Sequence, residues 1–83
     1  MELEAYTLCL RQQAHDLAKD AGTEDAILAK VIEACRAERR DLFLQLQQPP
    51  LNATREAATE AVKQLTTAMY PAMMSAIQAG RGN

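Results

Sequence analysis

The sequence has few large apolar side chains. Among 83 residues there is no Trp, one Phe and two Tyr, whereas Ala occurs sixteen times and Leu ten times. Alanine lets helices approach closely but removes little area from water, and burial contributes only about 25 cal/mol per Å². A core of this kind offsets the chain entropy of a small domain only marginally. We therefore expect one domain, residues 1–83, that gains further burial from self-association or from a protein partner.

Long apolar runs and a basic amino terminus are also missing. No stretch approaches the roughly 20 apolar residues that a membrane span requires. The amino terminus reads MELEAYTLCL, with two acids where a signal peptide would carry bases. Cys9 and Cys35 form no framework, so we expect small buried hydrophobes, with a disulfide as the alternative. These features predict a cytoplasmic protein without membrane association.

An excess of positive charge is absent as well. The net charge is −2, and acids and bases are interspersed from Glu2 to Lys63. Without a basic field to attract phosphate backbones, nucleic acid is a poor candidate partner. The one dense charge cluster is RAERRD, residues 36–41, which contains both signs.

Arg39 is the most informative residue of that cluster, because it lies within the apolar arc of its predicted helix. If this helix and the next form a hairpin, Arg39 could reach Glu56 or Glu60, with its methylene groups along apolar surface. The alternative is an arginine that contacts an anion or a partner. Arg36, Arg39 and Arg40 together would be the recognition residues of a DNA-binding regulator.

Strand-like alternation and internal repeats are absent, and apolar residues recur at helical spacing. The sequence predicts an all-α protein of three helices, at residues 2–21, 24–48 and 52–79, followed by a tail at residues 80–83. The stripe of the first helix is expected to run through Leu3, Thr7, Leu10, Ala14, Leu17 and Ala21.

The helix boundaries carry recognisable signals. Gly22 suits the left-handed position that closes a helix, and Thr23 can cap the second helix. Pro49–Pro50 ends that helix, and Asn52 or Thr54 can cap the third. Because the connection is short, we expect the second and third helices to form an antiparallel hairpin.

The longest uncharged segment is Gln64–Gly80. Pro71 lies inside it and removes the amide that would bond the carbonyl of Thr67, so the third helix should be kinked or broken. Two apolar stripes run along the segment, one including Met69 and Met73 and the other formed by Tyr70, Met74 and Ile77. One neighbouring helix cannot cover both stripes.

The second stripe is therefore either core or a surface that a partner covers. Leu8 and Leu44 each lie opposite the main stripe of their own helix, so every helix has an apolar residue that a closed three-helix bundle would leave in water. This pattern favours an assembly. The predicted partner-binding residues are Leu8, Leu44, Met69, Tyr70, Met73, Met74 and Ile77.

A catalytic or metal-binding constellation is missing too. His15 has no second His or Cys at ligand spacing, and we interpret it as a solvated side chain. The acids are scattered, and no Ser or Cys has a base nearby in the pattern. We expect no enzymatic activity, no metal and no cofactor.

The sequence thus favours a small helical protein–protein interaction module that acts as a homo-oligomer or as a subunit of a complex. One form is a bacterial secretion co-chaperone that shields an aggregation-prone subunit, with which the chain shares its short length, acidic balance and predicted hairpin. Another is a phage protein that inhibits a host factor. The alternative class is the DNA-binding regulator that uses Arg36, Arg39 and Arg40.

Overall fold

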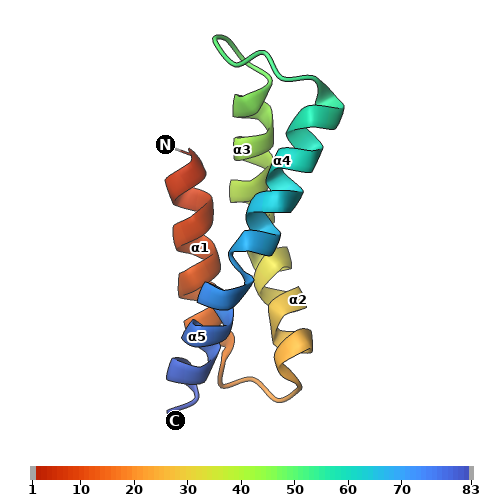
Figure 1. Cartoon of the computed structure of the whole chain (residues 1–83). Coiled ribbons are helices and arrows are strands. Elements are labelled where there is room, and N and C mark those ends of the chain that lie inside the picture. The colour runs from red at the N-terminus through yellow and green to blue at the C-terminus, as the bar shows by residue number, and fades with distance from the viewer. Residues whose placement is uncertain (1, 83) are drawn as a thin grey trace.

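The computed structural model describes residues 2–82, which form five α-helices (Figure 1). These are α1 (Glu2–Leu17), α2 (Glu24–Ala34), α3 (Arg36–Leu46), α4 (Arg55–Ala68) and α5 (Tyr70–Gly80). Residues 2–82 contain no strand, and the all-α prediction is confirmed. The predicted count of three helices is wrong, because the second and third predicted helices are each divided in two.

The chain makes three passes along a molecule of 44 × 20 × 18 Å (Figure 1). α1 runs from the amino terminus to the opposite end, α2 and α3 return in succession, and α4 and α5 run back again. α3 packs against α4, whereas α5 packs against α1 and α2. The predicted hairpin of two continuous helices is therefore not matched in detail, since the last pass changes neighbours halfway along its length.

Each break within a pass is one residue long. Cys35 separates α2 from α3 with φ −99° and ψ 20°, and Met69 separates α4 from α5 with φ −82° and ψ −8°. Pro71 lies in the first turn of α5, where a missing N–H costs least because that group has no partner within the helix. Pro71 thus accounts for the second break, which was predicted as a kink or a break. The break at Cys35 was not predicted.

The caps follow the sequence signals closely. α1 ends at Leu17 rather than at residue 21, and Gly22 then adopts φ +130°, a conformation that favours glycine. The hydroxyl of Thr23 accepts a hydrogen bond of 3.2 Å from the backbone N–H three residues on, which caps α2. Thr54 caps α4 in the same way at 3.1 Å, so Thr54 rather than Asn52 is the cap.

α1 is the central helix, because it packs against α2, α3 and α5. Its buried face consists of Tyr6, Leu10 and Ala14, spaced by four residues, and the buried Ala18 continues this spacing just after the end of α1. Leu3, which the predicted stripe included, is exposed. The other helices and the break at residue 35 complete the core with Ile27, Leu28, Val31, Cys35, Leu42, Ala58, Val62, Met73 and Ile77.

The carboxyl end of the chain is fixed to α1. Gly80 is buried, and its Cα lies so close to the His15 carbonyl and the Ala18 side chain that a Cβ would overlap both. Arg81 donates hydrogen bonds to the carbonyls of Ala18 at 3.0 Å and Gly22 at 2.9 Å. The tail predicted from residue 80 is corrected accordingly, since Gly80 ends α5 and Arg81 binds the end of α1 and the loop after it.

Cys9 and Cys35 form a disulfide that links α1 to the junction between α2 and α3. The favoured prediction of two thiols acting as small hydrophobes is wrong, and the alternative, a disulfide, is present, because the packing of α1 brings the Cα atoms of these residues to 5.9 Å. Disulfides persist in oxidising compartments and are rare in the cytosol. The cysteines therefore no longer support the cytoplasmic prediction.

We predict that Gly80→Ala destabilises the protein by about 1–3 kcal/mol, because the added methyl group overpacks the contact with α1. In an exposed helix the same change would stabilise by about 1 kcal/mol, so the sign of the effect tests the close approach. Urea unfolding followed by circular dichroism measures it. Gln78→Ala, at an exposed position of α5, is the control and should stay within about 0.5 kcal/mol of wild type. A more stable Gly80→Ala variant would contradict this packing.

We also predict that reducing the Cys9–Cys35 disulfide lowers the free energy of unfolding by about 3.5 kcal/mol, because the bond closes a loop across a separation of 26 residues. Urea unfolding with and without dithiothreitol measures the change. A variant with both cysteines replaced by Ser should show no effect of the reductant. Equal stability of wild type in both conditions would show that the bond does not constrain the unfolded chain.

Candidate functional site

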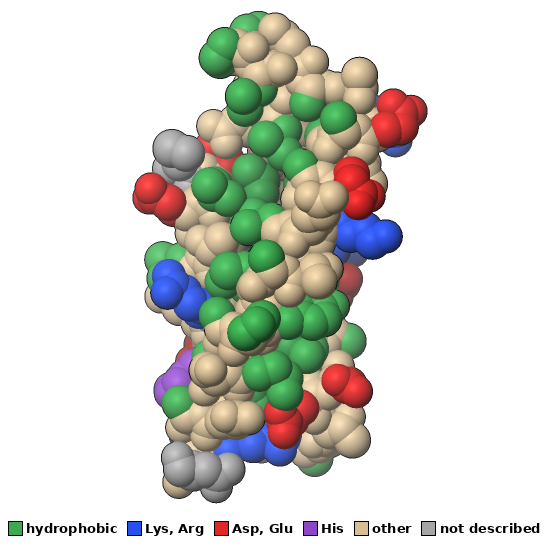
Figure 2. Space-filling view, viewed as in Figure 1, with side chains coloured by type: hydrophobic (Ala, Val, Ile, Leu, Met, Phe, Trp, Pro, Cys, Tyr) green, Lys and Arg blue, Asp and Glu red, His purple; other side chains and the backbone are tan. Residues whose placement is uncertain are grey.

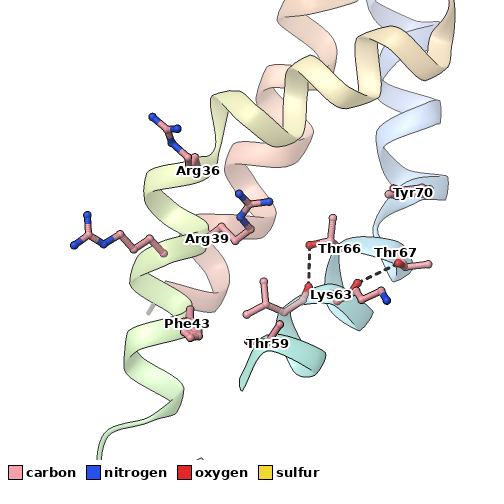
Figure 3. A pocket seen from close by; sticks show the side chains of 10 residues that line it. Arg36, Arg39, Phe43, Thr59, Lys63, Thr66, Thr67 and Tyr70 are labelled. Carbon is pink, nitrogen blue, oxygen red and sulfur yellow. Dashed lines mark hydrogen bonds between the residues drawn. The ribbon is translucent and has the colours of Figure 1, made fainter. Parts of the chain in front are cut away.

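An open groove lies between α3 on one side and α4 with the start of α5 on the other (Figure 3). We call it the α3–α4 groove, and its volume is about 540 Å³. The lining residues are Arg36, Arg39, Arg40 and Phe43 from α3, Thr59, Val62, Lys63, Thr66 and Thr67 from α4, and Tyr70 from α5.

The α3–α4 groove is basic, although the whole chain has a net charge of −2. Its lining includes Arg36, Arg39, Arg40 and Lys63 and no acidic residue. Residues three and four apart are neighbours on a helix surface, so the three arginines share one side of α3. The groove therefore concentrates positive charge on a molecule that is otherwise slightly acidic.

Arg39 is the inward-facing cation of the groove. It is half-buried and lies between α3 and α4, whereas Arg36 points away from α4 (Figure 3). Arg36 pairs with Glu33 at 3.1 Å on the surface. Within residues 2–82 the ion pairs involve other residues, so Arg39 does not form the expected pair with Glu56 or Glu60. Its guanidinium therefore has no carboxylate partner within residues 2–82.

Apolar and aromatic surface lies beside these charges. Val62 is buried, Phe43 is half-buried, and Tyr70 is 40% exposed. Tyrosine and arginine dominate binding energies at protein interfaces, because both combine a large contact area with hydrogen-bond donors. The groove thus places apolar contact area beside cationic side chains, which discriminate between ligands by charge.

The threonine hydroxyls of the α4 wall are already engaged as donors. Thr59, Thr66 and Thr67 each donate to the backbone carbonyl four residues earlier, at 2.8, 2.8 and 3.0 Å. Figure 3 shows the bonds of Thr66 and Thr67. A hydroxyl has one proton and two lone pairs, so these groups now present acceptors to the groove. The donors among the lining side chains are therefore the cations and the Tyr70 hydroxyl.

Thr66 also fixes the α4 wall to α1. Its Oγ1 lies 2.6 Å from the hydroxyl of Tyr6, which is fully buried. Because the Thr66 proton is donated to the carbonyl of Val62, Tyr6 is the donor in this bond. The bond holds one wall of the groove to the central helix.

Two of the seven predicted partner-binding residues belong to the core. Met73 and Ile77 are 0% exposed, so their assignment to a docking surface is corrected. The physical reason is that α5 packs against both α1 and α2, which cover Met73 of one apolar stripe and Ile77 of the other. Met69 and Met74 are half-buried and pack against the same core.

The other three predicted residues are exposed but separate. Tyr70 lines the α3–α4 groove, Leu44 is exposed on α3, and Leu8 lies in a shallow hollow on α1 beside Arg11 and His15. The structure therefore does not unite the seven residues in one surface. Figure 2 shows instead a broken line of hydrophobic side chains along one face of the molecule, with charged groups at its edges.

The α4 wall of the groove, which includes Val62, Lys63 and Thr66, was not predicted from the sequence. The predicted hairpin could have indicated this wall, because a helix that follows a short connection packs back along the previous helix. The arginines of α3 and Lys63 of α4 then border a common space. In the sequence alone, Lys63 was only one of the charges interspersed along the chain.

Comparison with protein-family models, curated proteins and solved structures found no match. In the part of the chain that the structure describes, no helix has the length and apolar character to cross a membrane. Residues 2–82 also hold no cluster of three His, Cys, Asp or Glu side chains arranged for a metal ion. The α3–α4 groove is therefore the main structural evidence on function.

We predict that Tyr6→Phe lowers the free energy of unfolding by about 1 kcal/mol, because it removes the buried hydrogen bond to Thr66 while keeping the ring. Urea unfolding measures the loss. Tyr70→Phe is the matched control at an exposed tyrosine and should change stability by less than about 0.5 kcal/mol. Equal effects of the two substitutions would show that the Tyr6 bond does not hold α4 to α1.

Proposed function

We propose that this protein is a helical protein–protein interaction module and that the α3–α4 groove is its docking site. The observation that carries the proposal is the combination of open apolar surface at Phe43 and Tyr70 with the inward-facing, unpaired Arg39. Such a combination is typical of the centre of protein interfaces.

The shape of the groove supports a macromolecular partner. Pockets for small molecules bury most of their ligand, whereas this groove is open and bordered by two helices. Helical grooves of this type hold segments of other proteins through a few anchoring side chains.

The distribution of exposed apolar residues supports association more generally. Leu3, Leu8, Leu44, Leu51 and Tyr70 are the large exposed hydrophobic residues, and they occur on α1, on α3, in the loop after α3 and at the start of α5. Single exposed residues of this kind are normal in monomers. Together with the alanine-rich composition, they favour further burial in a homo-oligomer or a complex. A secretion co-chaperone or a phage-type inhibitor would be one form of such a module.

A nucleic-acid regulator is the second candidate, because Arg36, Arg39, Arg40 and Lys63 gather in one groove. Two features weigh against it. Arg36 is paired with Glu33, and the threonine oxygens of the α4 wall present acceptors, which do not bind phosphate. We therefore place a protein partner first.

We predict that Tyr70→Glu abolishes association while leaving the fold intact, because it removes the aromatic ring from the groove and places there a carboxylate that competes with the partner for the cations. Light scattering over a range of concentrations measures self-association, and cross-linking with mass spectrometry in the host identifies a bound protein. Tyr70→Glu should lower the mass towards that of a monomer or lose the cross-linked partner, with an unchanged circular dichroism spectrum.

Leu51→Glu is the matched control, since Leu51 is 62% exposed and lies outside the groove. It should behave as wild type in both measurements. A protein that is monomeric at every concentration and has no partner sensitive to Tyr70→Glu would contradict the proposed function.

A further inference from the structure

We propose that the occupant of the α3–α4 groove is an acidic amphipathic segment of a partner protein. Its carboxylates would bind Arg39 and Arg40, and an adjacent apolar side chain would lie against Phe43 and Tyr70. This inference rests on the function proposed above and specifies the chemistry of the partner.

The charge of the groove carries the first step. Four cations line it without one acid, and within residues 2–82 only Arg36 among them has an ion-pair partner. Partial burial of Arg39 strengthens its attraction for an anion, because the local dielectric constant is lower than in bulk water. Guanidinium groups bind carboxylates through two parallel hydrogen bonds, so a carboxylate would use the donors that the fold leaves open.

The apolar residues carry the second step. Arg39, Arg40 and Phe43 are three and four residues apart on α3, so the cations and the aromatic ring are neighbours on one helix surface. Tyr70 borders the same space from α5. A ligand must therefore place an acid and an apolar group within about one helical turn of each other. The α3 wall from Arg36 to Phe43 is roughly 10 Å long at about 1.5 Å per residue, which suits a short segment.

The threonine side chains of α4 provide the third observation, because their hydrogen-bonding capacity distinguishes a peptide ligand from a phosphate ligand. Thr59 and Thr67 line the groove and donate their protons within α4, so their oxygens can act only as acceptors for a ligand, whereas the Thr66 oxygen already accepts from Tyr6. Ionised phosphate groups have no donors for these oxygens. A peptide segment can supply donors from backbone or side-chain amides and has acceptors for the arginines, so both walls of the groove can be satisfied.

A displayed peptide library tests this inference. Random peptides of about 16 residues, long enough for roughly four helical turns, are selected on the immobilised full chain. Before each round the library is depleted on the variant Arg39→Gln/Arg40→Gln. Selected peptides are then synthesised, and their binding to wild type, to this variant and to Arg11→Gln is measured by fluorescence anisotropy. Arg11 is an exposed arginine of α1 outside the groove and provides the matched control.

The expected result is enrichment of peptides in which Asp or Glu adjoins a large apolar residue. Their affinity should fall about tenfold on the double variant, as expected for losing charge-assisted hydrogen bonds, and should be unchanged on Arg11→Gln. Added salt should weaken binding. If the double variant loses its helical circular dichroism, Arg40→Glu serves instead, because Arg40 is exposed.

Three results would overturn the inference. The enriched peptides could be neutral or basic and bind in a way that requires Tyr70 but not Arg39. That result would support a docking function and contradict the specificity for acidic segments. If no peptides are enriched but Tyr70→Glu still disrupts association, the groove binds a folded surface and not a peptide segment. An oligonucleotide that binds the groove more tightly than the selected peptides would assign it to nucleic acid.

Discussion

The close packing of α5 against α1 determines where the other helices can lie. The buried side chains of α1 become smaller along the helix, from Tyr6 and Leu10 to Ala14, with Ala18 just after its end. Near these small residues the backbone of Gly80 lies directly against the His15 carbonyl of α1. α5 therefore occupies the place beside α1, while α4 packs against α3 and reaches α1 through the hydrogen bond between Tyr6 and Thr66. The α3–α4 groove opens where these two arrangements meet.

The break at Met69 makes this division possible. A straight helix from residue 55 to residue 80 could not follow α3 and then change to α1 and α2. Pro71 cannot donate the backbone hydrogen bond of a helix interior, so the chain redirects here at little cost. The same change of neighbours explains why Met73 and Ile77, within the uncharged segment Gln64–Gly80, are apolar, since α1 and α2 bury both side chains.

Local signals in the sequence predicted local structure well. Thr23, Thr54, Gly22 and Pro71 mark features that depend on a few adjacent residues, and the structure places caps, a left-handed turn and a break at these points. Features that depend on packing between passes were missed or left open. The break at residue 35 and the α4 wall of the groove were missed, whereas the Cys9–Cys35 disulfide and the burial of the second apolar stripe were only alternatives. Periodicity identifies an apolar stripe but does not say which helix covers it.

Arg39 shows how the site differs from the rest of the surface. A purely structural role would be expected to include an ion pair with an acid of the facing helix, yet Glu56 and Glu60 of α4 do not pair with it. At about 4 Å two opposite charges attract by about 1 kcal/mol in water and about 4 kcal/mol at the dielectric constant typical near a protein surface. A half-buried guanidinium therefore gains more from a carboxylate than an exposed one does. Phe43 and Tyr70 line the same groove as Arg39, so positive charge and apolar area lie together there.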